Sequence, residues 1–284
     1  MTWSMLVIGT GYVGQRFLAQ QSAETVIGLS RSSISSEQHV ESYDLDAGGQ
    51  LPLALPDHYG ILYTVPPSPE SESDVRLERL LKELTPAPAR FAYISTTGVY
   101  GNRDGAEVDE LTSPDPQTGR ARLRMAAEQV LQSWGAKHHV DVSILRVPGI
   151  YGPERLGVER VREGAAVIDE ADVGPGNRIH VDDLVACCLA ALSNDAPAGI
   201  YNVGDGDLRS STWFTREVAR QCQLEPPPII SMEDAECEFS PMRLSFLKES
   251  RIVNTQKMND VLGVTPKYAN AEDGIRASLD EDRA

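Results

Sequence analysis

Short apolar runs alternate with segments of helical spacing along the first half of the chain. The runs that have the length of buried strands are 5–8, 25–29, 39–43, 60–65, 91–95 and 140–147. The segments whose apolar residues recur every three or four positions are 15–20, 71–84 and 120–134. This alternation predicts an α/β fold, a Rossmann-type doubly wound parallel sheet with helices on both faces. In such a fold, ligands bind beyond the carboxyl ends of the strands.

The alternation becomes irregular after residue 151, which predicts a second unit. A chain of 284 residues can bury one large core and a smaller lobe. We expect a dinucleotide-binding Rossmann domain at 1–150, to which residues 178–203 return. Residues 151–177 and 204–284 are expected to form a smaller C-terminal lobe that binds substrate.

A glycine motif joins the first predicted strand to the first predicted helix. Residues 9–14 are Gly-Thr-Gly-Tyr-Val-Gly, with the spacing G-x-G-x-x-G. Gly9 permits a tight turn, Gly11 lets the backbone approach a diphosphate, and Gly14 lets the helix pack on the strand. The free N–H groups at the helix start favour phosphate. The motif predicts a dinucleotide site that also includes Tyr12 and Val13, and the alternative is a glycine-rich turn without a ligand.

The end of the second predicted strand indicates which dinucleotide binds. An NAD site places an acidic residue about twenty positions after the glycine motif, where it holds the ribose 2′-hydroxyl. This chain has Ser30 and Arg31 there instead. A guanidinium can bind a 2′-phosphate through two hydrogen bonds, and a serine hydroxyl can add another. We therefore expect NADP rather than NAD, the alternative being that Arg31 is an ordinary surface arginine.

Composition excludes several classes of partner. The formal net charge is −16 and the sequence pI is about 4.7, which argues against nucleic acid and against anionic membranes. No apolar run approaches the length of a membrane span, and no basic segment precedes the first apolar run, so we expect no signal peptide. The four cysteines form no C-x-x-C and the histidines show no ligand spacing. We expect a cytoplasmic protein without a metal that binds a small molecule; a homodimer stays open.

Four motifs carry a resemblance to a known family. They are Ser-Thr-Thr-Gly-Val-Tyr-Gly at 95–101, Leu-Arg-Val-Pro-Gly-Ile-Tyr-Gly-Pro at 145–153, Arg-Ile-His-Val-Asp-Asp-Leu-Val at 178–185 and Tyr-Asn-Val-Gly at 201–204. In order and spacing they resemble the extended short-chain dehydrogenases/reductases of the NAD(P)-dependent epimerase/dehydratase family. The glycine motif departs from that group's usual G-x-x-G-x-x-G, so the chain resembles its atypical members.

The resemblance implies where the cofactor lies. It places Asp44 and Leu45 against the adenine and Pro148 beside the nicotinamide amide. It also implies that Thr64, Val65 and Pro66, at the end of a predicted strand, line the nicotinamide ribose. Each of these residues also has an interpretation as an ordinary strand-end or turn residue.

The chain lacks the family's catalytic pair. Members use a tyrosine and a lysine four residues later, within Y-x-x-x-K-x-x-x-E, and a serine or threonine hydroxyl. Aligned on Glu128, the chain has Arg120 and Arg124 at the pair and Thr96 at the hydroxyl. An arginine stays protonated near neutral pH, so Arg120 can stabilise charge but cannot exchange a proton.

Other interpretations of these positions stay open. Arg124 could donate to the nicotinamide ribose, as the lysine does, and Arg120 could attract a carboxylate or phosphate. Alternatively, both arginines and Glu128 form a solvated ion-pair row at i, i+4 spacing. Tyr100 is a candidate substitute acid, although the family keeps a tyrosine there beside the catalytic one.

Two functions follow. The first is an NADP-dependent oxidoreductase or epimerase that acts on a small polar or sugar-derived substrate with a displaced acid. The second is a non-catalytic NADP(H)-binding redox sensor or scaffold. The two arginines favour the second, whereas the retained hydroxyl of Thr96 and the turn at Gly149 favour a site that still holds a substrate.

Overall fold

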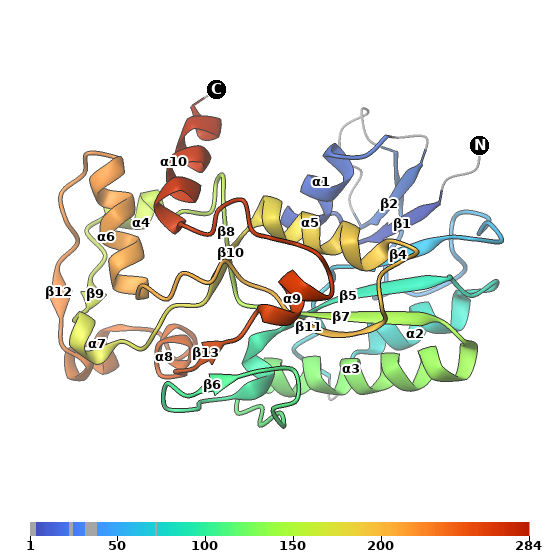
Figure 1. Cartoon of the computed structure of the whole chain (residues 1–284), viewed down its shortest axis with the longest axis horizontal. Coiled ribbons are helices and arrows are strands. Elements are labelled where there is room, and N and C mark those ends of the chain that lie inside the picture. Colours follow the sequence, from blue (N-terminus) through green and yellow to red (C-terminus); the bar gives the residue numbers. More distant parts are fainter. Residues whose placement is uncertain (1–3, 23–24, 32–38, 72, 284) are drawn as a thin grey trace.

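Seven parallel strands form the central sheet of the computed structural model, which describes residues 4–22, 25–31, 39–71 and 73–283. Their order across the sheet is β11-β7-β5-β4-β1-β2-β3 (Figure 1). The strands are β1 (Met5–Ile8), β2 (Val26–Ser30), β3 (Val40–Ser42), β4 (Gly60–Tyr63), β5 (Arg90–Thr96), β7 (Asp141–Val147) and β11 (Gly199–Asn202). From β1 the chain adds β2 and β3 on one side, and then β4, β5, β7 and β11 on the other, as in a doubly wound sheet. The predicted Rossmann-type fold is confirmed.

Two pairs of helices cover the sheet, one pair on each face (Figure 1). They are α1 (Tyr12–Ala19) and α5 (Val181–Leu192) on one face, and α2 (Val75–Glu83) and α3 (Gly119–His138) on the other. On the second face, Leu77, Leu80 and Leu131 are fully buried against the strands. The apolar spacing of the sequence thus sets which side of each helix meets the sheet.

Two of these helices, α3 and α5, begin where a side chain satisfies one of their first N–H groups. Thr118 caps α3, since its hydroxyl accepts from the Ala121 N–H at 3.3 Å. His180 caps α5 through Nδ1, which accepts from the Asp182 N–H at 3.2 Å. The helix α1 starts three residues earlier than its apolar spacing predicts, directly behind Gly11.

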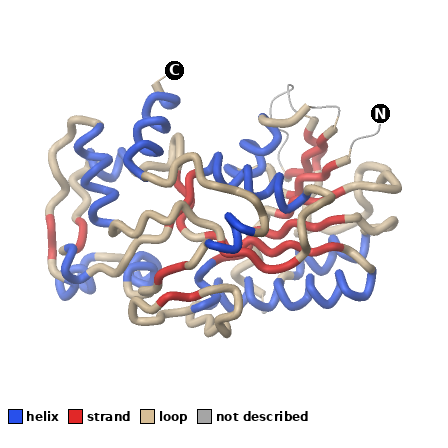
Figure 2. The backbone as a smooth tube through the Cα atoms, in the orientation of Figure 1, coloured by secondary structure: helices blue, strands red, loops and turns tan. Residues whose placement is uncertain are grey.

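Most of the remaining elements pack beside the sheet as a smaller body (Figure 2). The remaining helices are α4 (Val158–Arg162), α6 (Ser211–Gln221), α7 (Met232–Glu238), α8 (Pro241–Leu247), α9 (Gln256–Asp260) and α10 (Ala271–Asp282), and two 3-10 turns are η1 (Thr97–Tyr100) and η2 (Glu170–Asp172). Of these, α9 packs on the sheet beside β11 and η1 packs on α3. The short strands are β6 (Glu107–Val108), β8 (Gly149–Tyr151), β9 (Val167–Ile168), β10 (Arg178–His180), β12 (Ile229–Ile230) and β13 (Ile252–Val253). They pair as β8–β10, β9–β12 and β6–β13. The division at 1–150 and 178–203 against the rest stays a prediction.

Cores of different size hold the two parts. The sheet lies between two large apolar clusters, whereas Tyr151, Val218 and Ile275 belong to a smaller cluster among α4, α6 and α10. Within the described ranges, no helix is both long and apolar enough to cross a membrane. No group of three or more His, Cys, Asp or Glu residues in these ranges is arranged to hold a metal.

Candidate functional site

The glycine turn between β1 and α1 is built by close backbone contacts. Gly9 has a φ of +92°, in the region that favours glycine. A Cβ on Gly14 would overlap the carbonyl oxygen of Gly9. The hydroxyl of Thr64, just beyond β4, donates to the same carbonyl at 2.7 Å and holds the turn from the neighbouring strand. Gly9 and Gly14 therefore do what the motif predicts.

The open side of this turn fits a diphosphate. A Cβ on Gly11 would meet nothing within 4 Å, and no side chain caps the N-terminus of α1. Thr10 is only 4% exposed, and its hydroxyl has no partner within the described structure. Free N–H groups at the positive end of a helix bind anions. The residues at this turn thus fit the dinucleotide that the sequence predicts.

The side chains of Tyr12 and Val13 have partners within the protein. Val13 is buried in the core beneath α1. The Tyr12 hydroxyl donates to the carbonyl of Pro153 at 2.9 Å, and burial raises the pKa of this tyrosine to about 12. Both residues can therefore offer a ligand their backbone N–H groups, while the Tyr12 side chain joins α1 to the loop after β8.

A carboxylate lies near the predicted 2′-phosphate site. The Arg31 side chain is 67% exposed, and its Nη1 lies 3.4 Å from Oδ2 of Asp46. Arg76 binds the same carboxylate with two hydrogen bonds of 2.6 and 2.7 Å and holds the pKa of Asp46 below its ordinary value. The proximity of Asp46 was missed because it depends on the path of the chain after β3.

The segment predicted to contact adenine is fixed by its own polar contacts. Asp44 is exposed, and one of its carboxylate oxygens accepts from the Asp46 N–H at 2.9 Å. Leu45 is 7% exposed and packs in the core, so its side chain is unavailable to a ligand. Of the predicted pair, Asp44 alone presents a side chain to solvent.

Arg124 is anchored across the ends of two strands. Its Nη1 donates to the Ile94 carbonyl at 2.8 Å, to the Tyr93 hydroxyl at 3.0 Å and to the Val65 carbonyl at 3.3 Å. The next carbonyl, that of Pro66, accepts from Arg76 at 3.0 Å. Arginine at the lysine position thus ties α3 to β4 and β5, a structural contact that the spacing could not reveal.

The predicted solvated ion-pair row is wrong, because Glu128 is fully buried. Its carboxylate binds Arg146, 2% exposed, at 2.7 Å, and the hydroxyl of Ser95 donates to it. A buried carboxylate needs such partners to remain charged. The pair fixes α3 against β5 and β7, and so sets where the first turn of α3 lies.

Thr96, Arg120 and Pro148 line one cavity of about 600 Å³ at the carboxyl edge of the sheet. The Thr96 hydroxyl accepts from the Gly98 N–H at 3.1 Å. Arg120 reaches toward α8, where its Nη2 donates to the Ser245 hydroxyl at 3.2 Å. The structure thus brings the hydroxyl and tyrosine positions of the family pattern together, beside Pro148, the residue predicted to border the nicotinamide.

The cavity carries an excess of positive charge. Its lining includes Arg120, Arg155, Arg178 and Arg251, against one carboxylate, Glu249. Arg251 and Glu249 pair at 2.9 Å, and Arg178 lies 3.6 Å from Asp207, which is outside the lining. The lining itself has four guanidiniums against one carboxylate, so its field is positive. Such a lining favours an anionic ligand.

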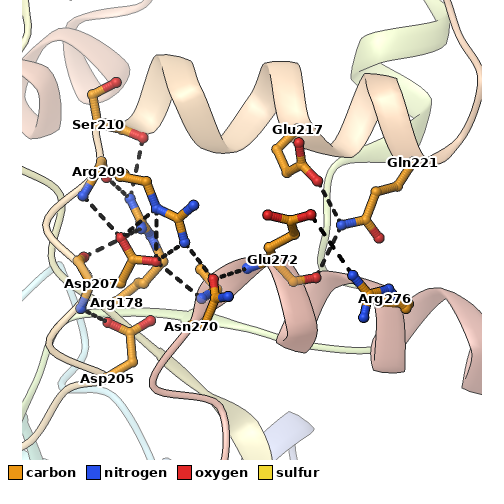
Figure 3. A network of polar contacts seen from close by, with 11 residues as sticks. Arg178, Asp205, Asp207, Arg209, Ser210, Glu217, Gln221, Asn270, Glu272 and Arg276 are labelled. Atoms are coloured by element: carbon orange, nitrogen blue, oxygen red, sulfur yellow. Dashed lines mark hydrogen bonds and ion pairs between the residues drawn. The ribbon is translucent and has the colours of Figure 1, made fainter.

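Arg178 is held by the network that Figure 3 shows. Its guanidinium donates to the carbonyls of Ser210, at 3.2 Å, and Arg209. Asp207 lies 3.6 Å from Arg178 and accepts from the Ala271 N–H at 3.0 Å, which ties this corner to α10. Sequence reasoning missed the arginines and the glutamate beyond residue 151, because their segments show no periodicity.

Neither Tyr100 nor Tyr151 presents its hydroxyl to the cavity. Tyr100 is fully buried, its hydroxyl donates to Asn202 Oδ1 at 2.7 Å, and burial raises its pKa. This geometry argues against the predicted use of Tyr100 as an acid. Tyr151 lines the cavity, but its hydroxyl is buried against Gly274, and burial raises its pKa well above the ordinary value.

Known proteins share the sequence pattern and the fold. The model of the NAD dependent epimerase/dehydratase family matches residues 71–204. Human dTDP-D-glucose 4,6-dehydratase is 27% identical over 137 residues, which are 45% of this chain and 39% of that protein. The chain spans about half or less of the length of the first curated relatives that it matches.

Two solved structures extend the likeness to the whole chain. A functionally unknown conserved protein from Silicibacter pomeroyi DSS has a TM-score of 0.82 and 28% identity, with 100% of both chains covered. MoeE5 in complex with UDP-glucose and NAD has a TM-score of 0.78 over 99% of this chain and 98% of its own, and at 18% identity it shows the fold alone. The match of the NAD dependent epimerase/dehydratase family model over residues 71–204 confirms the resemblance that the motifs carry.

Proposed function

We propose that this chain is an NADP(H)-binding member of its family that acts, as an oxidoreductase or epimerase, on a small anionic, sugar-derived substrate. The observation that carries the proposal is the arginine-lined cavity beside Thr96, Arg120 and Pro148 at the carboxyl edge of the sheet. A ligand there would lie next to the nicotinamide end of a dinucleotide bound at the glycine turn.

The glycine turn supports the nicotinamide dinucleotide. Gly11 offers an open approach, Gly9 and Gly14 keep the backbone compact, and α1 begins without a side-chain cap. MoeE5, a protein of the same fold, is in complex with NAD, which supports this class of cofactor. A bound nicotinamide would supply hydride exchange.

Arg31 supports NADP over NAD. Its exposed guanidinium contacts Asp46 only at 3.4 Å, so it can turn to a 2′-phosphate, with Ser30 beside it. Asp46 opposes this preference, because its carboxylate would repel a second anion nearby. Arg76 neutralises part of that charge through its two hydrogen bonds.

The cavity supports an anionic, sugar-derived ligand. Arg120 and Arg155 supply positive charge, and the hydroxyl of Thr96 can donate to a ligand oxygen while it accepts from Gly98. The similarity to dTDP-D-glucose 4,6-dehydratase supports a sugar bearing phosphate. In this site Arg120 would hold negative charge on the ligand, and a proton would have to come from another group or from water.

The second candidate is a redox sensor or scaffold that binds NADP(H) without turnover. The observation that favours it is the start of α3, where Arg120 stands at the tyrosine position and Arg124, one turn later, is bound to strand-end carbonyls. Neither group can exchange a proton near neutral pH.

Titration of the purified protein with NADPH and NADH, followed by NADPH consumption over a panel of carbonyl compounds and nucleotide sugars, tests both candidates. We expect NADPH to bind more tightly than NADH. Consumption with an anionic sugar supports the enzyme, and tight binding without consumption supports the sensor. If neither NADPH nor NADH binds, both candidate functions are contradicted.

A further inference from the structure

Arg155 lies where the cavity meets the start of α1. It follows β8 in the chain, lines the cavity from the side of the smaller lobe and is exposed. Its guanidinium carbon lies 4.1 Å from the centre of the Tyr12 ring. Tyr12 is the first residue of α1, so Arg155 stacks on the residue whose N–H belongs to the dinucleotide turn.

The loop that follows β8, residues 152–155, is held on α1 by direct contacts. The Tyr12 hydroxyl donates to the Pro153 carbonyl at 2.9 Å. Gly152 has a φ of +153°, and a Cβ there would crowd Tyr12 and Val181. Because the backbone at 152–153 touches the Tyr12 side chain directly, the position of Arg155 follows the position of the first turn of α1.

The charges around Arg155 favour the binding of an anion. Within the described structure it forms no ion pair, whereas Arg16, one turn further along α1, is paired with Asp182 at 2.7 Å and with Glu281. The start of α1 carries the positive end of the helix dipole. The guanidinium of Arg155 and this positive helix end repel each other, because no carboxylate of the described residues pairs with Arg155. An anion bound between the guanidinium and the helix end would remove the repulsion.

We propose that Arg155 binds the diphosphate of the dinucleotide from the side of the smaller lobe. The cofactor is then held between the N–H groups of α1 and a guanidinium that also lines the substrate cavity. Arg155 is thus a cofactor-binding residue contributed by the second part of the chain. The inference rests on the proposed function, since it requires a dinucleotide at the glycine turn.

Arg155→Gln, which keeps the length of the side chain and removes its charge, tests the inference. Calorimetric titration compares NADPH, 2′-phospho-ADP-ribose and adenosine 2′-monophosphate. We expect about a tenfold loss of affinity for the first two, which contain the diphosphate, because a charge-assisted hydrogen bond is lost. Affinity for adenosine 2′-monophosphate, which lacks it, should stay unchanged.

Arg160→Gln is the matched control, since it removes the same charge from an exposed position five residues later. It should leave all three affinities unchanged, and Arg155→Lys should restore part of the loss. Equal affinities in Arg155→Gln and the unmodified protein overturn the inference alone. So does an equal loss for all three ligands. If the unmodified protein binds none of them, the proposed function fails as well.

Discussion

The glycine turn before α1 and the first turn of α3 lie at the same edge of the sheet and are built in different ways. The glycine turn is shaped by backbone, since Gly14 packs on the Gly9 carbonyl and Thr64 holds that carbonyl from β4. The start of α3 acts through side chains, and there Arg120 and Arg124 replace the family's pair. The glycine turn has no room for a side chain at Gly9 or Gly14, whereas a site made of side chains can change its chemistry while the fold stays the same.

The largest expected effect comes from Gly14→Ala. The new Cβ would overlap the Gly9 carbonyl, so the turn must move, and we expect a loss of about 3 kcal/mol in unfolding free energy and loss of dinucleotide binding. Gly11→Ala is the control, because its Cβ meets nothing in the protein. It should leave stability within about 0.5 kcal/mol while weakening dinucleotide binding. Urea unfolding measures the stability of both variants. Equal unfolding free energies for Gly14→Ala and Gly11→Ala would contradict the steric account.

Arg31→Glu separates the two dinucleotides. It replaces the proposed partner of the 2′-phosphate with a like charge, so we expect NADPH affinity to fall about 100-fold and NADH affinity to change little. Fluorescence titration measures both. Arg122→Glu, an equal charge change on α3, should affect neither. Equal losses for NADPH and NADH would remove Arg31 as the reader of the 2′-phosphate.

Arg124→Leu tests whether the arginine at the family's lysine position has become structural. The substitution leaves the carbonyls of Val65 and Ile94 without their donor, and we expect a loss of about 2 kcal/mol in unfolding free energy. Arg122→Leu, on the exposed side of α3, should cost about 0.5 kcal/mol or less. If both variants unfold at the same urea concentration, the contacts of Arg124 contribute nothing to stability.

Asp205 gives a smaller effect that depends on pH. It is 5% exposed with one unpartnered carboxylate oxygen, and burial raises its pKa to about 7 from 3.8. The folded state therefore binds this proton more tightly than the unfolded chain. The resulting stability is present below about pH 4 and is lost as the pH rises to about 7.

The Asp205→Asn side chain cannot ionise. Between pH 4 and pH 7, the unfolding free energy of this variant should therefore rise by about 1–2 kcal/mol relative to that of the unmodified protein. Chemical unfolding across this range measures the difference. Asp195→Asn, on an exposed turn, is the control and should run parallel to the unmodified protein. A parallel course for Asp205→Asn would show that this carboxyl titrates normally.

The elements of the sheet could be predicted because each signals its own structure. Gly60–Tyr63 and Asp141–Val147 are short apolar strands, and Leu77, Leu80 and Leu81 show the spacing of a helix. The glycine motif placed its turn correctly because it acts through local backbone geometry.

The contacts that decide the chemistry could not be predicted in the same way. The burial of Glu128, on α3, depends on Arg146, which lies eighteen positions away on β7. The anchoring of Arg124 depends on carbonyls of β5 and of the end of β4. The cavity needs Glu249 and Arg251, which follow no periodic pattern. Such pairings arise only when the whole chain has folded.

Residues 249–253 return to the loop that follows β5 and complete one wall of the cavity. There β13 pairs with β6, the Ser250 carbonyl accepts from the Arg103 N–H at 2.9 Å, and Arg251 donates to the Gly101 carbonyl at 2.6 Å. During translation the glycine turn leaves the ribosome well before this wall does. A nascent chain can therefore meet a dinucleotide long before it has a finished pocket for any second ligand.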